Sequence, residues 1–195
     1  VARTPTPTSW TMLLQQVEYV RKNPELCNTL IIDTADWAEQ LAIQHVCAKA
    51  NVSGIEDFGY GKGYTYLAEE FGRLLNQLND VITTGINIVI TAHAMMRKFE
   101  QPDELAAYDR WELKLQKKTA PMVKEWADMV LFANYKTYVV TDEKTKSKKA
   151  AGGKRVMYTT HHPAWDAKNR ADLPEELPFE FEGITHVLPG FKDKS

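Results

Sequence analysis

An aspartate and a histidine each come at the end of a short apolar run, and this placement is the most informative feature of the sequence. Asp33 lies in the run TLIIDT (Thr29 to Thr34), and His93 closes the run NIVITAH (Asn87 to His93). Continuous Ile, Leu and Val residues over this length are typical of buried parallel strands. Because ligands bind beyond the carboxyl ends of such strands, we expect both side chains to face one crevice. This arrangement predicts a nucleotide site.

Asp33 and the hydroxyl of Thr34 have the chemistry of a magnesium site. A carboxylate at the end of a buried strand, followed by a hydroxyl residue, holds the hydration shell of Mg²⁺ in P-loop nucleotidases, where it is called the Walker B element. An aspartate that caps the following helix produces the same pattern, and Asp36 offers a second capping carboxylate. Both interpretations of Asp33 stay open at this point: a ligand of Mg²⁺ through water, and a helix cap.

Thr91 and His93 would place polar groups beside a bound phosphate. A histidine there can donate a hydrogen bond to a γ-phosphate oxygen and move when the phosphate leaves. The alternative is an ordinary loop histidine whose hydrogen bonds are satisfied within the protein. A crossover between the two apolar runs would bring His93 next to Asp33, which adds weight to the nucleotide interpretation without removing the other.

The elements that must position these residues form an α/β pattern. The first half is predicted to begin with a helix that Thr8 or Ser9 caps and Asn23-Pro24 ends, followed by a strand over 29–34. A helix over 35–50, with Trp37, Leu41 and His45 at four-residue spacing, and a loop over 54–66 come next. The last two elements are a strand over 87–92 and, before it, a helix whose one face carries Leu67, Phe71, Leu74, Leu75, Leu78 and Ile82.

The second half reads as a mainly antiparallel addition. No clean period runs through residues 94–118, and Pro121 then suits the first turn of a short helix. Residues 129–134 (MVLFAN) predict a third apolar strand, the alternation in 136–141 and 155–160 predicts a hairpin, and residues 185–188 predict a last short strand.

The composition excludes several classes of protein. The 195 residues suffice for one ordinary domain, and a net charge of −2 excludes a globally basic nucleic-acid binder. Cys27 and Cys47 are too few for a disulfide framework and are expected to be buried thiols in a reducing compartment. The apolar runs fall far short of the ~20 residues that a membrane span requires, so no membrane partner is expected. His161 and His162 near Asp166 lack a second ligand set, so no metal site is predicted there.

Several motifs together resemble the RecA-like P-loop ATPases encoded by phages, a family of phage nucleotide-binding proteins and single-strand annealing recombinases. The motifs are TLIIDT, GIEDFGYGKGY, NIVITAH, LKLQKKTAPMVKEWADMVLF and, further on, AKNRADLPEELPF. The resemblance runs from about Trp10 to Phe132 and into residues 167–179. It implies an α/β fold with a RecA-like, mostly parallel sheet flanked by helices, and a C-terminal antiparallel hairpin. Residues 1–195 would form a single domain, with residues 133–195 appended to its core.

The resemblance also implies roles for individual residues. Asp33 would be the Walker B carboxylate, and His93 the polar sensor at the end of the next strand. Lys117 and Lys118 resemble paired lysines that reach across a subunit interface to a neighbour's ATP, although charged pairs usually face water. Two loops would bind DNA: residues 58–64, with Phe58, Tyr60, Lys62 and Tyr64, and residues 94–109, with Arg97 and Lys98.

The chemistry of the first loop agrees with DNA binding. Its aromatic rings offer faces on which unpaired bases can stack, and Lys62 offers a cation for phosphate. The alternatives are a surface loop whose aromatic side chains fold back onto the core and, for Arg97 and Lys98, an ordinary solvated loop.

One element of the family is absent from the sequence: the phosphate-binding motif G-x-x-x-x-G-K-[ST]. Gly61-Lys62 is followed by Gly63, and Gly153-Lys154 by Arg155. The family places this motif upstream of Asp33, in a segment of roughly 30–60 residues. We therefore expect the sequence to be N-terminally incomplete, and the chain by itself to be inactive as an ATPase.

The function that follows from the resemblance is homologous recombination. The full-length protein would bind ATP and Mg²⁺ at subunit interfaces, self-associate into a ring or filament, and bind single-stranded DNA for annealing or strand pairing. A phage or host single-strand-binding protein would be a further partner, and the bacterial host cytoplasm the location. Two alternatives are a nucleotide-independent DNA-binding or assembly module and a DnaB-type RecA-fold helicase motor.

Overall fold

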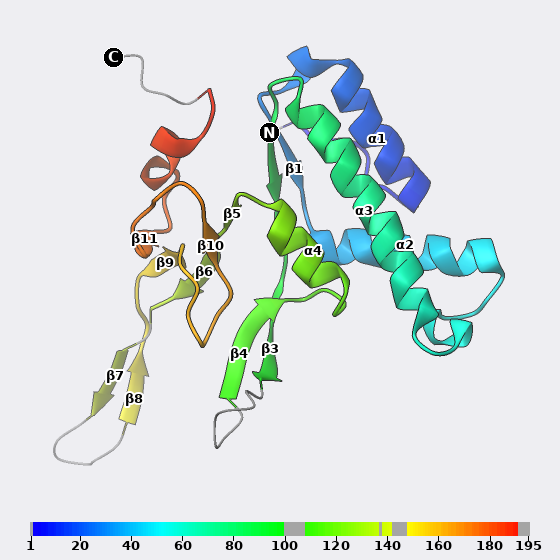
Figure 1. Cartoon of the computed structure of the whole chain (residues 1–195). Helices are drawn as coiled ribbons and strands as arrows, with labels where there is room; N and C mark the ends of the chain where they lie inside the picture. Colours follow the sequence, from blue (N-terminus) through cyan, green and yellow to red (C-terminus); the bar gives the residue numbers. More distant parts are fainter. Residues whose placement is uncertain (1, 100–107, 137, 142–147, 191–195) are drawn as a thin grey trace. The chain divides into compact units, whose positions relative to one another are not determined.

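The computed structural model describes residues 2–99, 108–136, 138–141 and 148–190, and the chain falls into two units (Figure 1). The first unit comprises Val1–Met95 and Leu113–Trp126, and the second comprises Met96–Glu112 and Ala127–Ser195. Helices and small sheets together make a mixed α/β protein. The predicted division at residue 133 stays a prediction.

The first unit has four α-helices among the described residues, and the first two begin at polar caps. The helices are α1 (Trp10–Lys22), α2 (Ala35–Ala50), α3 (Lys62–Ile82) and α4 (Thr119–Trp126), with the short 3₁₀ turns η1 (Pro24–Leu26) and η2 (Ile55–Phe58) between them. The Ser9 hydroxyl accepts a hydrogen bond from the Met12 N–H, and the Thr34 hydroxyl accepts one from the Trp37 N–H. Such oxygens satisfy N–H groups that have no partner within a helix. Of the two predicted caps for α1, the structure uses Ser9.

The two strands of the first unit are parallel neighbours, as expected from their apolar runs. They are β1 (Thr29–Ile32) and β2 (Asn87–Ile90), and Ile32 lies opposite Ile90 in their register. The chain returns from β1 to β2 through α2 and α3, which is the crossover that parallel strands require. Within the described ranges this sheet has two strands, so a long parallel sheet is not shown.

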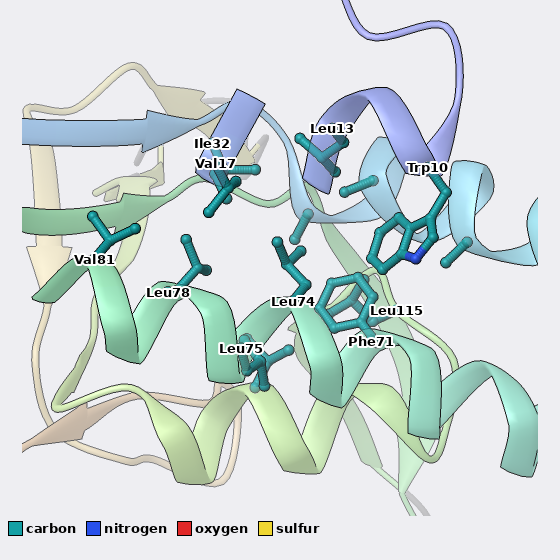
Figure 2. Packing of buried hydrophobic residues seen from close by; sticks show 14 of the residues in the cluster. Trp10, Leu13, Val17, Ile32, Phe71, Leu74, Leu75, Leu78, Val81 and Leu115 are labelled. Carbon is teal, nitrogen blue, oxygen red and sulfur yellow. The ribbon is translucent and has the colours of Figure 1, made fainter. Parts of the chain in front are cut away.

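The core of the first unit lies between α1, α3 and β1, and α3 carries most of it. Figure 2 shows Trp10, Leu13 and Val17 of α1 turned toward Phe71, Leu74 and Leu78 of α3, and these side chains are at most 8 % exposed. The rings of Trp10 and Phe71 lie 6.0 Å apart. Since burial of each large apolar side chain contributes about 1.5–3 kcal/mol, this interface stabilises the first unit.

The second unit is built from short antiparallel strands. β6 (Phe132–Tyr135), β9 (Arg155–Tyr158) and β11 (Glu176–Pro178) form a sheet in the order β11-β9-β6. The other pairs are β3 (Ala94–Phe99) with β4 (Tyr108–Leu113), β5 (Met129–Val130) with β10 (Lys168–Asn169), and β7 (Tyr138–Thr141) with β8 (Lys148–Ala151). β3 begins and β4 ends with residues that belong to the first unit.

Four expectations for this half differ from the structure. The second loop, expected over 94–109, instead contains strand β3 (Ala94–Phe99) and the first two residues of β4, and its residues 100–107 lie outside the described residues. Residues 138–141 pair with Lys148–Ala151 rather than with 155–160, and β9 pairs instead with β6 and β11. The run 129–134 is divided between β5 and β6. Residues Thr185–Val187 form a 3₁₀ turn (η4) after a similar turn at Phe181–Gly183 (η3). Alternating side chains define strands but do not specify their partners.

Stacked aromatic rings and a buried ion pair stabilise the second unit. Trp165 stacks on Tyr158 at 4.2 Å between ring centroids and on Phe132 at 6.1 Å. Arg110 pairs with Asp166, and both side chains are about nine-tenths buried. In the described part of the chain, no helix is long and apolar enough to cross a membrane.

Candidate nucleotide site

The carboxylate of Asp33 lies at the carboxyl end of the parallel pair and is exposed. It accepts a hydrogen bond of 2.7 Å from the hydroxyl of Thr91, which follows β2 directly. The backbone closes the same edge, because Ala35 N–H donates to Thr91 O at 2.8 Å and Thr91 N–H donates to Ile32 O at 3.0 Å. The peptide bond between Asp33 and Thr34 is cis. Asp33 and Thr91 are therefore neighbours on adjacent strand ends.

Thr34, and not Asp33, is the N-cap of α2. Its backbone is extended, with φ −128° and ψ 164°, and its hydroxyl lies 3.5 Å from the Trp37 N–H. Thr34 therefore fills the N-cap position, and the interpretation of Asp33 as the helix cap is wrong. This leaves the Asp33 carboxylate at the surface, where a cation and phosphate oxygens can reach it.

His93 is held by Asp36 from the first turn of α2. Its backbone N–H donates to Asp36 Oδ1 at 3.1 Å, and its ring Nδ1 lies 2.9 Å from Asp36 Oδ2. The Asp36 residue is only 7 % exposed, whereas the His93 side chain is 59 % exposed. A buried carboxylate thus grips one side of the histidine, and the rest of the ring is open to solvent.

Hydrogen bonds keep the Asp36 carboxylate ionised despite its burial. Burial is the largest single influence and would raise the pKa of Asp36. The hydrogen bonds from the Thr34 hydroxyl, the His93 N–H and the His93 ring together outweigh it, so the pKa of Asp36 lies below its usual value. Sequence reasoning considered Asp36 only as a second capping residue.

A second buried acid of α2 holds the segment before the two lysines. Glu39 is 2 % exposed, and both of its carboxylate oxygens lie 3.1 Å from the Gln116 N–H, which donates to them. His93 O accepts from the Lys114 N–H at 2.8 Å. The backbone after β4 is therefore fastened to both α2 and the end of β2. Glu39 was missed at the sequence level, although Asp36 and Glu39 share a helix face with Ala35, Ala38 and Ala42.

The two lysines follow directly and differ in their contacts. Lys117 is exposed, and Lys118 Nζ donates to the hydroxyl of Thr65 on α3 at 2.6 Å. Both ammonium groups belong to the first unit, as do Asp33 and His93. Their role toward a neighbouring subunit stays a prediction.

The loop predicted to bind DNA presents one aromatic side chain fully to solvent. Gly59, Tyr60 and Gly61 all have positive φ, of 68°, 47° and 69°, and Tyr60 is fully exposed. Glycine adopts such angles readily and tyrosine rarely does, so the flanking glycines allow the turn that projects Tyr60. The loop expected over 58–64 ends at Gly61, because Lys62 to Tyr64 form the first turn of α3, and Lys62 is exposed there.

The other two aromatic residues of the loop fold back. Phe58 packs edge-on against Tyr66 at 5.4 Å, and Tyr64 lies against the core and donates its hydroxyl hydrogen to Glu56. This hydrogen bond to a carboxylate raises the pKa of Tyr64. Gly63 allows the close packing, since a Cβ there would lie 2.4 Å from Ile55 O. Of the four predicted contacts, Tyr60 and Lys62 are accessible.

The remaining predicted site residues belong to the second unit. Arg97 on β3 pairs with Glu112 on β4 at 3.8 Å, and Lys98 is exposed. A cavity of about 580 Å³ is lined by residues of the stretch 160–175, including His161, Lys168 and Arg170. Lys168 donates to Ala127 O at 2.5 Å and Arg170 to Asp128 at 3.0 Å, so both cations have partners within the protein. The described residues contain no group of three or more His, Cys, Asp or Glu able to hold a metal ion.

The comparisons with known proteins give one result. A family model described as an AAA domain (AAA_24) matches residues 1–171, which include Asp33, Asp36, Thr91, His93 and the two lysines. No curated protein and no solved structure matches the chain.

Proposed function

Because the chain belongs to the AAA domain family, a family of nucleotide-binding P-loop-type ATPases, we propose that it binds ATP with Mg²⁺ at the edge where β1 and β2 end. The observation that carries the proposal is the hydrogen bond between Thr91 and the exposed Asp33 carboxylate at the carboxyl ends of two parallel strands. Ligands of open α/β sheets bind at this edge.

The donor set at this edge fits magnesium. Mg²⁺ takes hard oxygen ligands and is usually held by one or two carboxylates, water and substrate phosphates. Asp33 offers one such carboxylate, exposed and oriented by Thr91. When bound, Mg²⁺ would neutralise charge on the phosphates of the nucleotide. Asp33 would hold it through water, Thr34 would lie beside it, and His93 would couple the state of the nucleotide to the following loop.

We further propose that the protein acts in recombination on single-stranded DNA. The support is the loop 58–64, in which Tyr60 is fully exposed beside Lys62. An exposed ring next to a cation suits an unpaired base and its phosphate. Arg97 and Lys98 of the second unit are proposed as a separate contact to DNA phosphates. Lys117 and Lys118 would reach the ATP of a neighbouring subunit in a ring or filament, where a cation stabilises charge on the transferred phosphoryl group.

The direct test is nucleotide binding with and without Mg²⁺. Asp33→Asn should weaken MgATP binding and leave binding of ATP in EDTA unchanged, because the carboxylate acts through the metal. Asp80→Asn is the matched control, since Asp80 is an exposed aspartate on the last turn of α3. Equal MgATP affinity in wild type and Asp33→Asn would refute the assignment.

The alternative function is a nucleotide-independent DNA-binding or assembly module. It is favoured by the absence of a G-x-x-x-x-G-K-[ST] motif from the sequence. The two functions differ in one measurement: DNA affinity that MgATP leaves unchanged supports the module, and DNA affinity that MgATP alters supports the ATPase. Unwinding of a forked duplex with ATP would instead identify a DnaB-type motor.

A further inference from the structure

The two hydrogen bonds between His93 and Asp36 determine which ring nitrogen carries the proton. Oδ1 accepts the backbone N–H at 3.1 Å, so the carboxylate is fixed with Oδ2 opposite Nδ1 at 2.9 Å. An ionised carboxylate can only accept hydrogen bonds. Nδ1 is therefore the protonated nitrogen, and in the neutral ring Nε2 keeps its lone pair.

The lone pair on Nε2 is free to accept a hydrogen bond from a ligand or water, because the ring is exposed. The His93 side chain is 59 % exposed although its partner carboxylate is buried, so the ring is anchored at Nδ1 and open elsewhere. His93 comes two residues after Thr91, whose hydroxyl contacts the Asp33 carboxylate. An acceptor thus lies on the same strand end as the proposed nucleotide site.

We propose that Asp36 is a positioning residue, which holds His93 in the tautomer protonated at Nδ1 so that Nε2 acts as the hydrogen-bond acceptor and base for the attacking water. This inference rests on the proposed ATPase function and deepens it. The water oxygen bonds to the γ-phosphorus, and the bond from that phosphorus to the β,γ-bridging oxygen breaks with its electron pair staying on ADP. The water proton passes to Nε2, and the resulting imidazolium is stabilised by Asp36 until it releases a proton to solvent.

The geometry predicts what Asp36→Asn does to the ring. The backbone N–H of His93 requires an oxygen acceptor, so the amide oxygen of Asn must take the place of Oδ1. The amide NH₂ then faces Nδ1 and donates to it, which forces the proton of the neutral ring onto Nε2. The same change at the aspartate of a Ser-His-Asp triad imposes the wrong tautomer and lowers kcat about 10⁴-fold.

The first experiment is a tautomer measurement on the protein labelled with ¹⁵N at histidine, by two-bond ¹⁵N–¹H correlation spectra. We expect neutral His93 to carry its proton on Nδ1 in the wild type and on Nε2 in Asp36→Asn. Glu39→Gln is the matched control, because it alters a buried acid one turn later that bonds to Gln116 instead, and it should leave the tautomer unchanged. If the neutral His93 ring of the wild type is protonated on Nε2, the proposal is overturned. This measurement needs no variant, so the proposal can be tested even if Asp36→Asn does not fold.

The second experiment is MgATP hydrolysis by the full-length protein, which separates this inference from the function on which it rests. Asp36→Asn should lower kcat about 10²–10⁴-fold and change KM little, as expected for loss of a base. Wild-type hydrolysis with an unchanged kcat in Asp36→Asn overturns the role of Asp36 and leaves the ATPase function standing. If the full-length wild type does not hydrolyse MgATP, the function and the water-activating role are overturned together, whichever tautomer the spectra give.

Discussion

Removal of the Thr91 hydroxyl tests the proposed nucleotide site most directly. Thr91→Val keeps the shape of the side chain and deletes the donor that lies 2.7 Å from Asp33 Oδ1. A hydrogen bond to a charged group contributes about 1.5–3 kcal/mol when buried, but both partners here are exposed and water can replace the hydroxyl. We therefore expect the free energy of unfolding to fall by less than about 1 kcal/mol.

The effect on nucleotide binding should be larger than the effect on stability. Without Thr91 the Asp33 carboxylate is no longer oriented, and ordering one such side chain on binding costs about 0.5–1.5 kcal/mol. This range corresponds to a loss of MgATP affinity of about 2- to 12-fold. The assay is calorimetric titration with MgATP, repeated with ATP in EDTA, where the difference between wild type and variant should vanish.

Thr83→Val is the matched control for this substitution. The Thr83 hydroxyl is also exposed and donates to Asp80 O at 2.6 Å, at the end of α3. It should bind MgATP as the wild type does. An equal loss of affinity in both variants, or a loss in Thr91→Val that persists in EDTA, would show that the hydroxyl does not act through a metal-binding Asp33.

Four further predictions concern stability, pH, DNA and turnover. Phe71→Ala should lower the free energy of unfolding in urea by about 3–5 kcal/mol because Phe71 is fully buried against Trp10, whereas Ile82→Ala on the same helix, at a side chain 46 % exposed, should cost well under half of that. The hydrogen bond from Arg21, helped by Lys22, lowers the pKa of Glu18 from 4.5 to about 2. Stability from this carboxylate is present above pH 4.5 and lost as the pH falls toward 2, so the difference in unfolding free energy between wild type and Glu18→Gln should disappear over that range. Tyr60→Ala should weaken binding of a fluorescent single-stranded oligonucleotide by about 1–3 kcal/mol, and unchanged affinity would remove Tyr60 from the DNA surface. In the full-length protein, Lys118→Ala should leave ATP binding intact and abolish turnover, and a normal turnover rate would contradict its action on a neighbour's ATP.

The elements of the first unit could be predicted because their patterns are local. The apolar positions of α3 recur at helical spacing, and Leu67, Phe71, Leu74, Leu75 and Leu78 are buried. Ile82, predicted on the same face, is 46 % exposed, and Val81 is buried in its place. The two runs of Ile, Leu and Val become β1 and β2, and their parallel pairing places Asp33 beside Thr91. The expectation that both strands are buried is wrong in part, because Ile31 is 50 % exposed and Val89 is 44 % exposed.

The anchoring of His93 could not be predicted, because it depends on which face of α2 is buried. Trp37, Leu41 and His45 stand out at four-residue spacing, yet Trp37 is 67 % exposed and the buried face carries small alanines with Asp36 and Glu39. Small side chains let a helix approach its neighbours closely, which brings the two acids to partners 57 and 77 residues later in the sequence. Contacts of this range are set by packing and leave no local pattern.

The strands of the second unit were harder to predict for a different reason. In β3 (AMMRKF) the half-buried positions are Met95, Arg97 and Phe99, and Met96 is exposed. Apolar and charged residues therefore occur on both faces, and the sequence does not show the period of 2 that is typical of a strand. β7 and β9 both alternate, and only the three-dimensional structure shows that β9 pairs with β6 and β11. The apolar run at residues 185–188 is too short for its sequence to distinguish a strand from a turn, and Thr185–Val187 form a 3₁₀ turn.

The two buried acids of α2 determine how variants at these positions should combine in their effect on activity. Asp36 fastens the strand end that carries the histidine, and Glu39, one turn later, fastens the backbone that leads to the lysines. A substitution that tilts this helix would displace both groups at once. Variants of the two acids should therefore not combine additively. The double variant should lose less activity than the product of the single losses predicts, because Asp36→Asn already removes most of the activity that the lysines would support.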